Sequence, residues 1–547
     1  MSQVNKNIII DKKYEGKTFY EISKEFVNDE GLEPLLVNVN GTDKELNHIA
    51  KSGDEVHFIY YSTDVGNFAY KKTGIFVMLC AFYRALNVSA ELKYMFGDTY
   101  FFQIPSIKIT DEIYEKVQKE FDRIVEEDIV IKKHVLPRKT AMQIIEKREM
   151  KDVDLLFKYI YKPEIKFREI DGFFKYIYGE ILYSTGQLKN YIVKKFENSI
   201  LLIFPSFNDF SYINEFDIPK NLVGEINEYI DWENKTKINT IGKYNSFIAN
   251  NDYKSLIIMS ESLHDKNLGI IADDIVSHKN KLVCISGPSC SGKTSFSHRL
   301  SYHLLALGID SFPLAADNFF VDRGETPRTK DGELDFECLE AIDIKLLNDV
   351  LNKLLNGEEV IIPKFDFING KKIFDEKNKV KLKDNQIVIL EGIHCLNPKL
   401  IPSLKEEDKY TIFVAPLNKY AMDNANPISS NDIRLLRRIS RDSKTRGYSA
   451  KETILRWDKV IEGDNNNIYP CIKYVKSIFN TSTLYELNVM KVSIMPQLYC
   501  INDDEEVGYT ARRLIKILNY VLPESAENIP NYAIAREFIG GSVLDVG

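Results

Sequence analysis

The chain has no hydrophobic segment long enough to span a bilayer, and it has no paired cysteines. Its longest uncharged apolar run, Gly74 to Tyr83, is about half of the ~20 residues that a spanning helix needs. The first residues, SQVNKNIIIDKK, carry charge where a signal peptide has its apolar region. The 7 cysteines are scattered without a Cys-x-x-Cys pair, which argues against a zinc knuckle or a disulfide framework. We therefore expect a cytoplasmic protein that makes no membrane contact.

Positive charge is also in short supply, since 72 Lys and Arg stand against 80 Asp and Glu, for a formal net charge of −8. This balance argues against a surface that coats nucleic acid, because phosphate neutralisation requires a basic face, although it leaves room for a local basic patch. The 547 residues exceed what one hydrophobic core holds and suggest about three or four domains.

The segment GPSCSGKT, residues 287–294, is the most specific motif in the chain. It follows the apolar run LVCIS and precedes a helical pattern whose apolar residues recur at three- and four-residue spacing from Phe296 to Leu307. This strand, loop and helix order is the context of a phosphate-binding P-loop, in which backbone N–H groups face a polyphosphate. The lysine supplies charge for the β- and γ-phosphates, and the final hydroxyl can bind Mg²⁺. The motif predicts ATP binding by Gly287, Ser289, Ser291, Gly292, Lys293 and Thr294.

Three parts with different patterns follow one another along the chain. Residues 1–61 contain short alternating runs around the Asn40-Gly41 turn, which suit a β-grasp domain. Residues 62–240 mix helical patterns, such as 112–127, with apolar strands, such as 199–205, and predict an α+β domain that ends in a polar linker at about 233–251. In residues 255–547 strands alternate with helices, which predicts an α/β domain with a mainly parallel sheet and a ligand beyond the carboxyl ends of the strands. We expect these strands at 282–286, 310–316, 358–365, 386–392 and 410–415.

Two acidic residues stand at the ends of predicted strands. Asp317 follows the strand at 310–316 in the sequence ADNFF, and Glu391 ends the next buried strand in EGIH. Both are therefore expected at the sheet edge that holds the P-loop. A carboxylate there can complete a magnesium shell or accept the proton of an attacking hydroxyl, and the ordinary alternative is an acid that only caps the next helix.

Residues 431–447, NDIRLLRRISRDSKTRG, form an arginine-rich helical pattern. A solvated basic face is the usual explanation of such a run. Arginine forks bind phosphate oxygens bidentately, however, and a P-loop followed by such a helix is typical of a kinase whose lid closes over the transferred phosphoryl group.

In that order, GPSCSGKT, ADNFF, DFECLEAID, PKFDF, EGIH and RLLRRISRDSKTRG resemble the motifs of the uridine kinase and phosphoribulokinase family, over roughly residues 280–490. The resemblance implies phosphorylation of a small-molecule hydroxyl by ATP and Mg²⁺. It implies that Asp317 is the catalytic base, that Lys293 binds phosphate and that Thr294 and Glu391 organise the metal. It assigns Arg437, Arg438, Arg441 and Arg446 to the lid, and Arg434 to the substrate.

On the acceptor side the chain departs from the uridine kinase pattern. Glu337 stands where the family places an aspartate that holds the ribose hydroxyls, and Phe320 and Phe365 replace two tyrosines. Gly370 stands where a histidine would face the pyrimidine. The two phenylalanines could stack on a base but cannot hydrogen-bond to it. A ribonucleoside is thus the expected acceptor, with its base loosely specified.

The front of the chain resembles a TGS domain followed by the N-terminal editing-type domain of threonyl-tRNA synthetase. The stretch that matches the synthetase's paired-histidine motif, GIFVMLCAFYRAL, has no histidine, so hydrolytic editing is not expected. Two functions remain open: a small-molecule kinase with a regulatory front half, and a nucleotide-gated RNA-binding protein that phosphorylates no acceptor. Asp317 favours the first, because a pure switch needs no base, and the net charge weakens the second.

Overall fold

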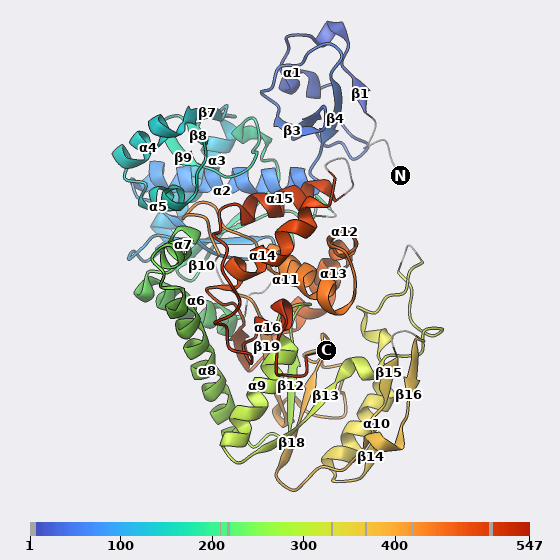
Figure 1. Ribbon diagram of the computed structural model, residues 1–547. Coiled ribbons are helices and arrows are strands. Elements are labelled where there is room, and N and C mark those ends of the chain that lie inside the picture. The colour runs from blue at the N-terminus through green and yellow to red at the C-terminus, as the bar shows by residue number, and fades with distance from the viewer. Residues whose placement is uncertain are drawn as a thin grey trace.

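Figure 1 shows the computed structural model, which describes residues 7–546 apart from 208, 216–218, 330–331, 367–368, 418–419 and 503–506. The N-terminal sheet lies at one end of the molecule and the sheet that carries the P-loop lies toward the other. Helices from the last third of the chain lie between them.

The N-terminal part is a four-stranded sheet with one short helix. Its elements are β1 (Ile8–Ile9), α1 (Phe19–Ser23), β2 (Leu36–Val39), β3 (Thr42–Glu45) and β4 (Glu55–Ile59), and the strand order is β1-β4-β2-β3. Asn40 and Gly41 both have positive φ, 49° and 79°, as the predicted two-residue turn between β2 and β3 requires. The β-grasp assignment of this part stays a prediction.

The second part holds two antiparallel sheets. The first, in the order β10-β11-β6-β5, comprises β5 (Glu91–Phe96), β6 (Thr99–Gln103), β10 (Ile192–Phe196) and β11 (Ser199–Ile203). The second comprises β7 (Lys132–Pro137), β8 (Glu164–Ile170) and β9 (Phe173–Tyr176). Around them lie α2 (Asp64–Leu86), α3 (Asp111–Glu126), α4 (Arg138–Lys147) and α5 (Lys151–Tyr159). The predicted helix at 112–127 and strand at 199–205 correspond to α3 and β11.

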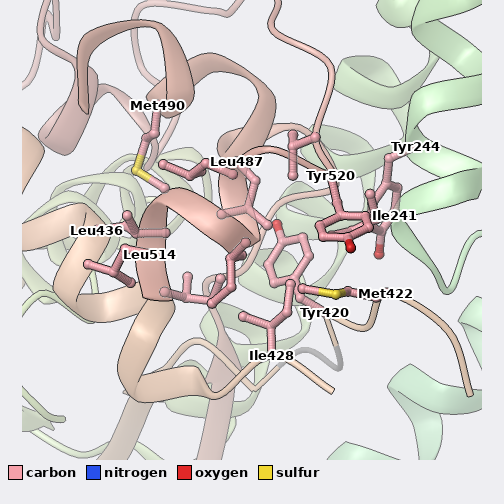
Figure 2. Packing of buried hydrophobic residues seen from close by; sticks show 14 of the residues in the cluster. Ile241, Tyr244, Tyr420, Met422, Ile428, Leu436, Leu487, Met490, Leu514 and Tyr520 are labelled. Carbon is pink, nitrogen blue, oxygen red and sulfur yellow. The ribbon is translucent and has the colours of Figure 1, made fainter. Parts of the chain in front are cut away.

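The segment expected as a linker is mostly helical. Residues 233–251 cover the end of α6 (Lys220–Thr236) and all of α7 (Ile241–Ala249), and α8 (Tyr253–His278) follows. Ile241 and Tyr244 are buried and pack against Tyr420 and Tyr520 from the last third of the chain, as Figure 2 shows. The linker prediction is wrong because a few apolar residues on one face of α7 suffice to bury it, although most of the segment is polar.

The third part is a five-stranded parallel sheet in the order β13-β18-β12-β19-β20. Its strands are β12 (Leu282–Ser286), β13 (Asp310–Ala315), β18 (Gln386–Glu391), β19 (Lys409–Ala415) and β20 (Ser477–Asn480). The helices of this part are α9 (Lys293–Ala306), α10 (Ile344–Leu355), α11 (Ser430–Thr445), α12 (Ala450–Leu455), α13 (Trp457–Gly463), α14 (Glu486–Tyr499), α15 (Gly508–Leu518) and α16 (Arg536–Ile539). The predicted parallel α/β sheet is confirmed, but one of its five strands is formed by a different segment from the predicted one.

The exchanged strand is the one expected at 358–365. That segment forms β14 (Val360–Ile361) and β15 (Lys364–Asp366), which pair outside the main sheet with β17 (Lys379–Val380) and β16 (Lys371–Ile373). Pro363 between them has no N–H to donate, which interrupts the run. The fifth place in the sheet goes to β20, a run of four residues that is too short to be recognised by its pattern.

Among the described residues, no helix combines the length and the apolar character that crossing a bilayer would take.

Candidate functional site

The P-loop lies at the carboxyl end of β12, the central strand of the parallel sheet. A Cβ on Gly287 would stand 1.9 Å from the Val414 carbonyl oxygen, and one on Gly292 would stand 2.7 Å from Ile534 Cγ2. Gly292 also has φ +89°, which L side chains rarely adopt. Only glycine fits at either position, so the tight loop that the motif predicts is what the chain forms before α9 begins at Lys293.

Lys293 closes the loop over its own backbone. Its Nζ donates to the carbonyl oxygens of Gly287, at 2.8 Å, and Pro288, at 3.2 Å. The neighbouring Ser291 Oγ is buried and has no hydrogen-bond partner among the described residues. A cation above a loop that precedes a 14-residue helix is an arrangement suited to a polyphosphate, because the amino end of the helix carries partial positive charge.

Thr294 and Glu391, the predicted metal ligands, contact each other. Thr294 Oγ1 donates to Glu391 Oε1 over 3.2 Å, while Glu391 Oε2 is buried with no hydrogen-bond partner in the described part of the chain. Burial raises the pKa of Glu391 to about 7, against the opposing effect of Lys293. An orphaned carboxylate oxygen beside a threonine hydroxyl fits Mg²⁺, which prefers oxygen ligands and reaches such sites together with nucleotide phosphates.

Asp317 follows β13 at the same edge of the sheet, where Ala315 pairs with Glu391 of β18. Asp317 is exposed, but partial loss of hydration among the surrounding protein atoms raises the pKa of its carboxyl group. Lys293 and then Arg446 lower that pKa. Lys293 is thus close enough to act on both Asp317 and Glu391. The predicted base and the predicted metal ligand therefore lie at one edge of the sheet, near the P-loop lysine.

Glu337 belongs to the same site, although it comes from a loop. Burial and then Asp464 raise the pKa of Glu337 to about 7, whereas Arg438 and Lys293 lower it and Asp317 raises it further. Its main chain is fixed by Asn467, whose Nδ2 donates to the Glu337 carbonyl oxygen at 2.8 Å. The structure therefore brings Lys293, Thr294, Asp317, Glu337 and Glu391 together.

The predicted substrate arginine, Arg434, and one predicted lid arginine, Arg437, have another place. Arg434 and Arg437 are buried, with 1% and 0% of their surface exposed. Arg434 is paired with Asp464 and donates to the Ser289 carbonyl oxygen at 3.0 Å. Arg437 is paired with Glu486 at 2.8 Å and reaches the Cys290 carbonyl oxygen at 3.3 Å. Both guanidinium groups thus donate to carbonyl oxygens of the P-loop and to buried carboxylates. Their N–H groups are engaged there rather than with a transferring phosphoryl group.

The other arginines of α11 lie nearer the site. Arg438 Nη1 donates to Ser289 Oγ at 2.8 Å, and Arg446 is 46% exposed and 3.6 Å from Asp442. Arg441 stands 3.7 Å from Glu537, which in turn accepts a 2.7 Å hydrogen bond from Ser295 Oγ. Arg441, four residues after Arg437, lies on the same helix face and is 15% exposed. The lid role stays a prediction for Arg438, Arg441 and Arg446.

The two predicted acceptor phenylalanines belong to a buried hydrophobic cluster. Phe320 and Phe365 are 6% and 3% exposed, and their rings meet edge to face with centroids 5.6 Å apart. Gly370 has φ +65°, and a Cβ there would stand 2.6 Å from Arg323 Nε. Arg323 therefore occupies the space beside the position where the resemblance expects a histidine.

Sequence reasoning missed the acids that support these groups. Asp464, Glu486 and Glu537 lie far from the P-loop in sequence and belong to no recognised motif, but each accepts a hydrogen bond from an arginine of α11 or from α9. The burial of two arginines requires such partners, because an unpaired buried charge is costly. In the sequence, these acids are indicated only by that requirement, and the requirement does not identify which acid pairs with which arginine.

Comparison with known proteins matches the same part of the chain. The family model described as "Phosphoribulokinase / Uridine kinase family" matches residues 282–486. The uridine kinase of Mycoplasma genitalium is 31% identical over 186 residues, which is 34% of this chain and 78% of that protein. The uridine kinase of Mycoplasma pneumoniae is 30% identical over 185 residues, which covers 77% of its length. A solved structure described as a possible uridine kinase from Bacillus stearothermophilus is 17% identical, with 39% of this chain and 98% of that chain covered and a TM-score of 0.27.

Proposed function

The chain belongs to the phosphoribulokinase and uridine kinase family, and on that premise we propose that it transfers the γ-phosphoryl group of ATP to the 5′-hydroxyl of a ribonucleoside. It is an ATP-dependent kinase that uses Mg²⁺. The observation that carries the proposal is that Lys293 of the P-loop acts electrostatically on both Asp317 and Glu391, which stand at the ends of the neighbouring strands β13 and β18.

Each residue of the site has a role in this reaction. Lys293 exchanges the carbonyl oxygens of Gly287 and Pro288 for phosphate oxygens, which stabilises the charge on the polyphosphate. Asp317 accepts the proton of the attacking hydroxyl as the new O–P bond forms and the bond to the β-phosphate breaks, leaving ADP. Thr294 and Glu391 would hold Mg²⁺, which neutralises phosphate charge when it is bound.

The acceptor half supports a ribonucleoside with relaxed base choice. Glu337 is a carboxylate suited to a vicinal diol, so 2′-deoxynucleosides should be poorer substrates. Phe320, Phe365 and Gly370 offer a base no side-chain hydrogen bond that would reject a wrong one. Differences in apolar contact discriminate by only about 1–3 kcal/mol, whereas a required hydrogen bond rejects by far more.

A panel of acceptors tests this proposal. ADP release should be measured with the four ribonucleosides, 2′-deoxyuridine, ribulose 5-phosphate, pantothenate and simple sugars. We expect turnover with several ribonucleosides and less with the deoxynucleoside. Turnover with a phosphorylated sugar and with no nucleoside would reject the nucleoside acceptor while leaving the kinase reaction in place.

For the front half we propose a TGS-like domain and a synthetase-like domain that sense a ligand and regulate the kinase. RNA contact by these domains has no support beyond the resemblance, and the net charge of −8 disfavours it. A mobility assay with bulk tRNA should show no salt-sensitive binding. A complex that weakens steeply with salt would favour the RNA-binding alternative.

A further inference from the structure

A cavity lies between the front half and the helices of the third part. Its volume is about 460 Å³, and it is lined by α2, the β5–β6 hairpin, the start of α11, α13 and α15. Lys293, Asp317, Glu337 and Glu391 do not line it. A volume of this size is in the range of small-molecule sites in proteins.

Lys72 of α2 is the unusual residue in this lining. Its side chain is 4% exposed, and its Nζ has no hydrogen-bond partner among the described residues. The rings of Phe68 and Tyr178 lie 5.3 and 5.7 Å from the ammonium, which compensates its burial in part. Burial still lowers the pKa of Lys72 to about 8, against Asp423 and Asp432, which raise it.

The acids nearest in the lining are already matched. Asp98 pairs with Lys71 at 2.6 Å, Asp64 accepts from Thr510 at 2.9 Å, and Asp432 is paired with Arg513. The ammonium of Lys72 is therefore a buried cation in the cavity lining with no hydrogen-bonded anion among the described residues, and Asp423 and Asp432 act on it only through space, a costly arrangement.

The rest of the lining suits the body of an organic molecule. Tyr94, Tyr100, Phe207 and Trp457 contribute aromatic surface to the cavity. The Asn67 amide nitrogen and the Tyr94 hydroxyl are buried with no hydrogen-bond partner in the described part of the chain. Such convergence of aromatic walls with a few orphaned polar groups is characteristic of ligand sites.

We propose that this cavity binds a small organic anion, whose carboxylate or phosphate pairs with Lys72 and whose apolar body lies against the aromatic walls. This site goes beyond the kinase reaction and does not depend on the identity of the acceptor.

The cavity also touches the P-loop. Pro288 lines it, and so does Arg434, whose Nε donates to the Ser289 carbonyl oxygen at 3.0 Å. A ligand in the cavity would therefore contact a residue of the nucleotide loop.

The test uses 8-anilinonaphthalene-1-sulfonate, a fluorescent aromatic anion, and the full chain with its P-loop saturated by ADP and Mg²⁺. Wild-type protein should bind one equivalent with increased fluorescence. Lys72→Met should weaken binding about tenfold or more, because it removes a charge-assisted contact. Lys93→Met is the matched control, since Lys93 is also buried but pairs with Glu91 at 2.7 Å and lies outside the lining.

Displacement from wild-type protein keeps the test independent of the variants' folding. Phenyl phosphate or benzoate should displace the dye, and benzyl alcohol should not. The stronger competitor of the two anions identifies the head group that the site prefers. Equal displacement by the neutral alcohol, or wild-type affinity in a folded Lys72→Met protein, would overturn the proposal. So would an equal loss in the Lys72→Met and Lys93→Met proteins.

Discussion

Two carboxylates near Lys293 have different environments, and the difference agrees with their predicted roles. Asp317 is open to solvent and close to Lys293 and Arg446, where it can meet an incoming hydroxyl. Glu391 is half-buried and accepts a hydrogen bond from the Thr294 hydroxyl, which places it next to a ligand bound at the P-loop. The first is suited to accept a proton and the second to hold a cation.

Asp317→Asn should separate base from binder. The amide is nearly isosteric but cannot take the proton, so kcat should fall by about 10²–10⁴ while ATP affinity persists. Steady-state kinetics and ATP titration measure the two quantities. Asp349→Asn is the control, because Asp349 is 57% exposed and pairs only within α10, with Lys353. An unchanged kcat in the Asp317→Asn protein would remove Asp317 from the mechanism.

Glu391 should make the stability of the nucleotide-free protein depend on pH. Because its pKa rises from 4.5 to about 7 on folding, the folded state keeps a proton that the unfolded chain releases. The free energy of unfolding should therefore fall as pH increases between these values. Glu337, with the same direction of shift, adds to the effect. Thermal midpoints across this range measure it, and Glu391→Gln should flatten the curve. A Glu391→Gln curve as steep as that of the wild type contradicts the assignment.

The same ionisation should appear in activity with the opposite sign. Mg²⁺ requires the ionised carboxylate, so kcat/KM for ATP should rise with pH through about 7. Glu391→Gln should lose this limb and need more Mg²⁺ for half-maximal rate. A variant with the wild-type pH profile and metal requirement would place the metal elsewhere.

At the scale of elements, α11 is the clearest case of one helix with two functions. Arg434 and Arg437 are buried and donate to carbonyl oxygens of the P-loop, while Arg438 donates to Ser289 Oγ and Arg446, just after the helix, acts on Asp317. The sequence shows five arginines at helical spacing and predicts their helix correctly. It could not show which of them are buried, because their partners Asp464 and Glu486 are brought near only by the fold.

Exchanges on the two faces of α11 should have different effects. Arg437→Met leaves Glu486 as an unpaired buried charge, so it should lower the free energy of unfolding by about 3–5 kcal/mol. Arg446→Ala, at a half-exposed position, should leave stability nearly unchanged and reduce kcat. Denaturant unfolding and kinetics distinguish them. Equal stability of the two variants would mean that α11 does not brace the P-loop as described.

The local pattern predicted elements well where the chemistry is local. The P-loop strand, its helix and the strand-end acids were predicted because glycine positions and apolar runs within a few residues determine them. The strand at 358–365 was wrong because Pro363 breaks a run whose apolar character alone looked sufficient. β20 was missed because its four residues join the sheet only through the neighbouring β19.

At the scale of the whole molecule, the front half and the third part share one hydrophobic core. Leu156 and Phe157 of α5 belong to the same cluster as Leu436, Leu487 and Leu514. Polar contacts cross the same boundary, since the Tyr176 and Tyr520 hydroxyls lie 2.8 Å apart and Asn426 Nδ2 donates to the Tyr176 carbonyl oxygen at 3.0 Å. The sequence analysis predicted a linker between these two parts, because contacts between distant segments leave no local pattern.

Residues 255–547 expressed alone should therefore be less stable than the full chain. Removing the front half exposes the faces of α11, α14 and α15 that it covers, so the fragment should melt at a lower temperature and bind more hydrophobic dye. Calorimetry of both proteins measures this. A fragment with the melting temperature of the full chain would show that the shared core contributes little.

The central claim is that this site phosphorylates a nucleoside hydroxyl with Asp317 as the base, and product identification tests it most directly. Wild-type and Asp317→Asn proteins should be incubated with γ-labelled ATP, Mg²⁺ and uridine, and the labelled product separated from ATP and phosphate. The account predicts label in the nucleoside 5′-monophosphate with the wild type and a loss of about 10²–10⁴ in its rate with the variant. Label released only as inorganic phosphate, or a variant as active as the wild type, would contradict it.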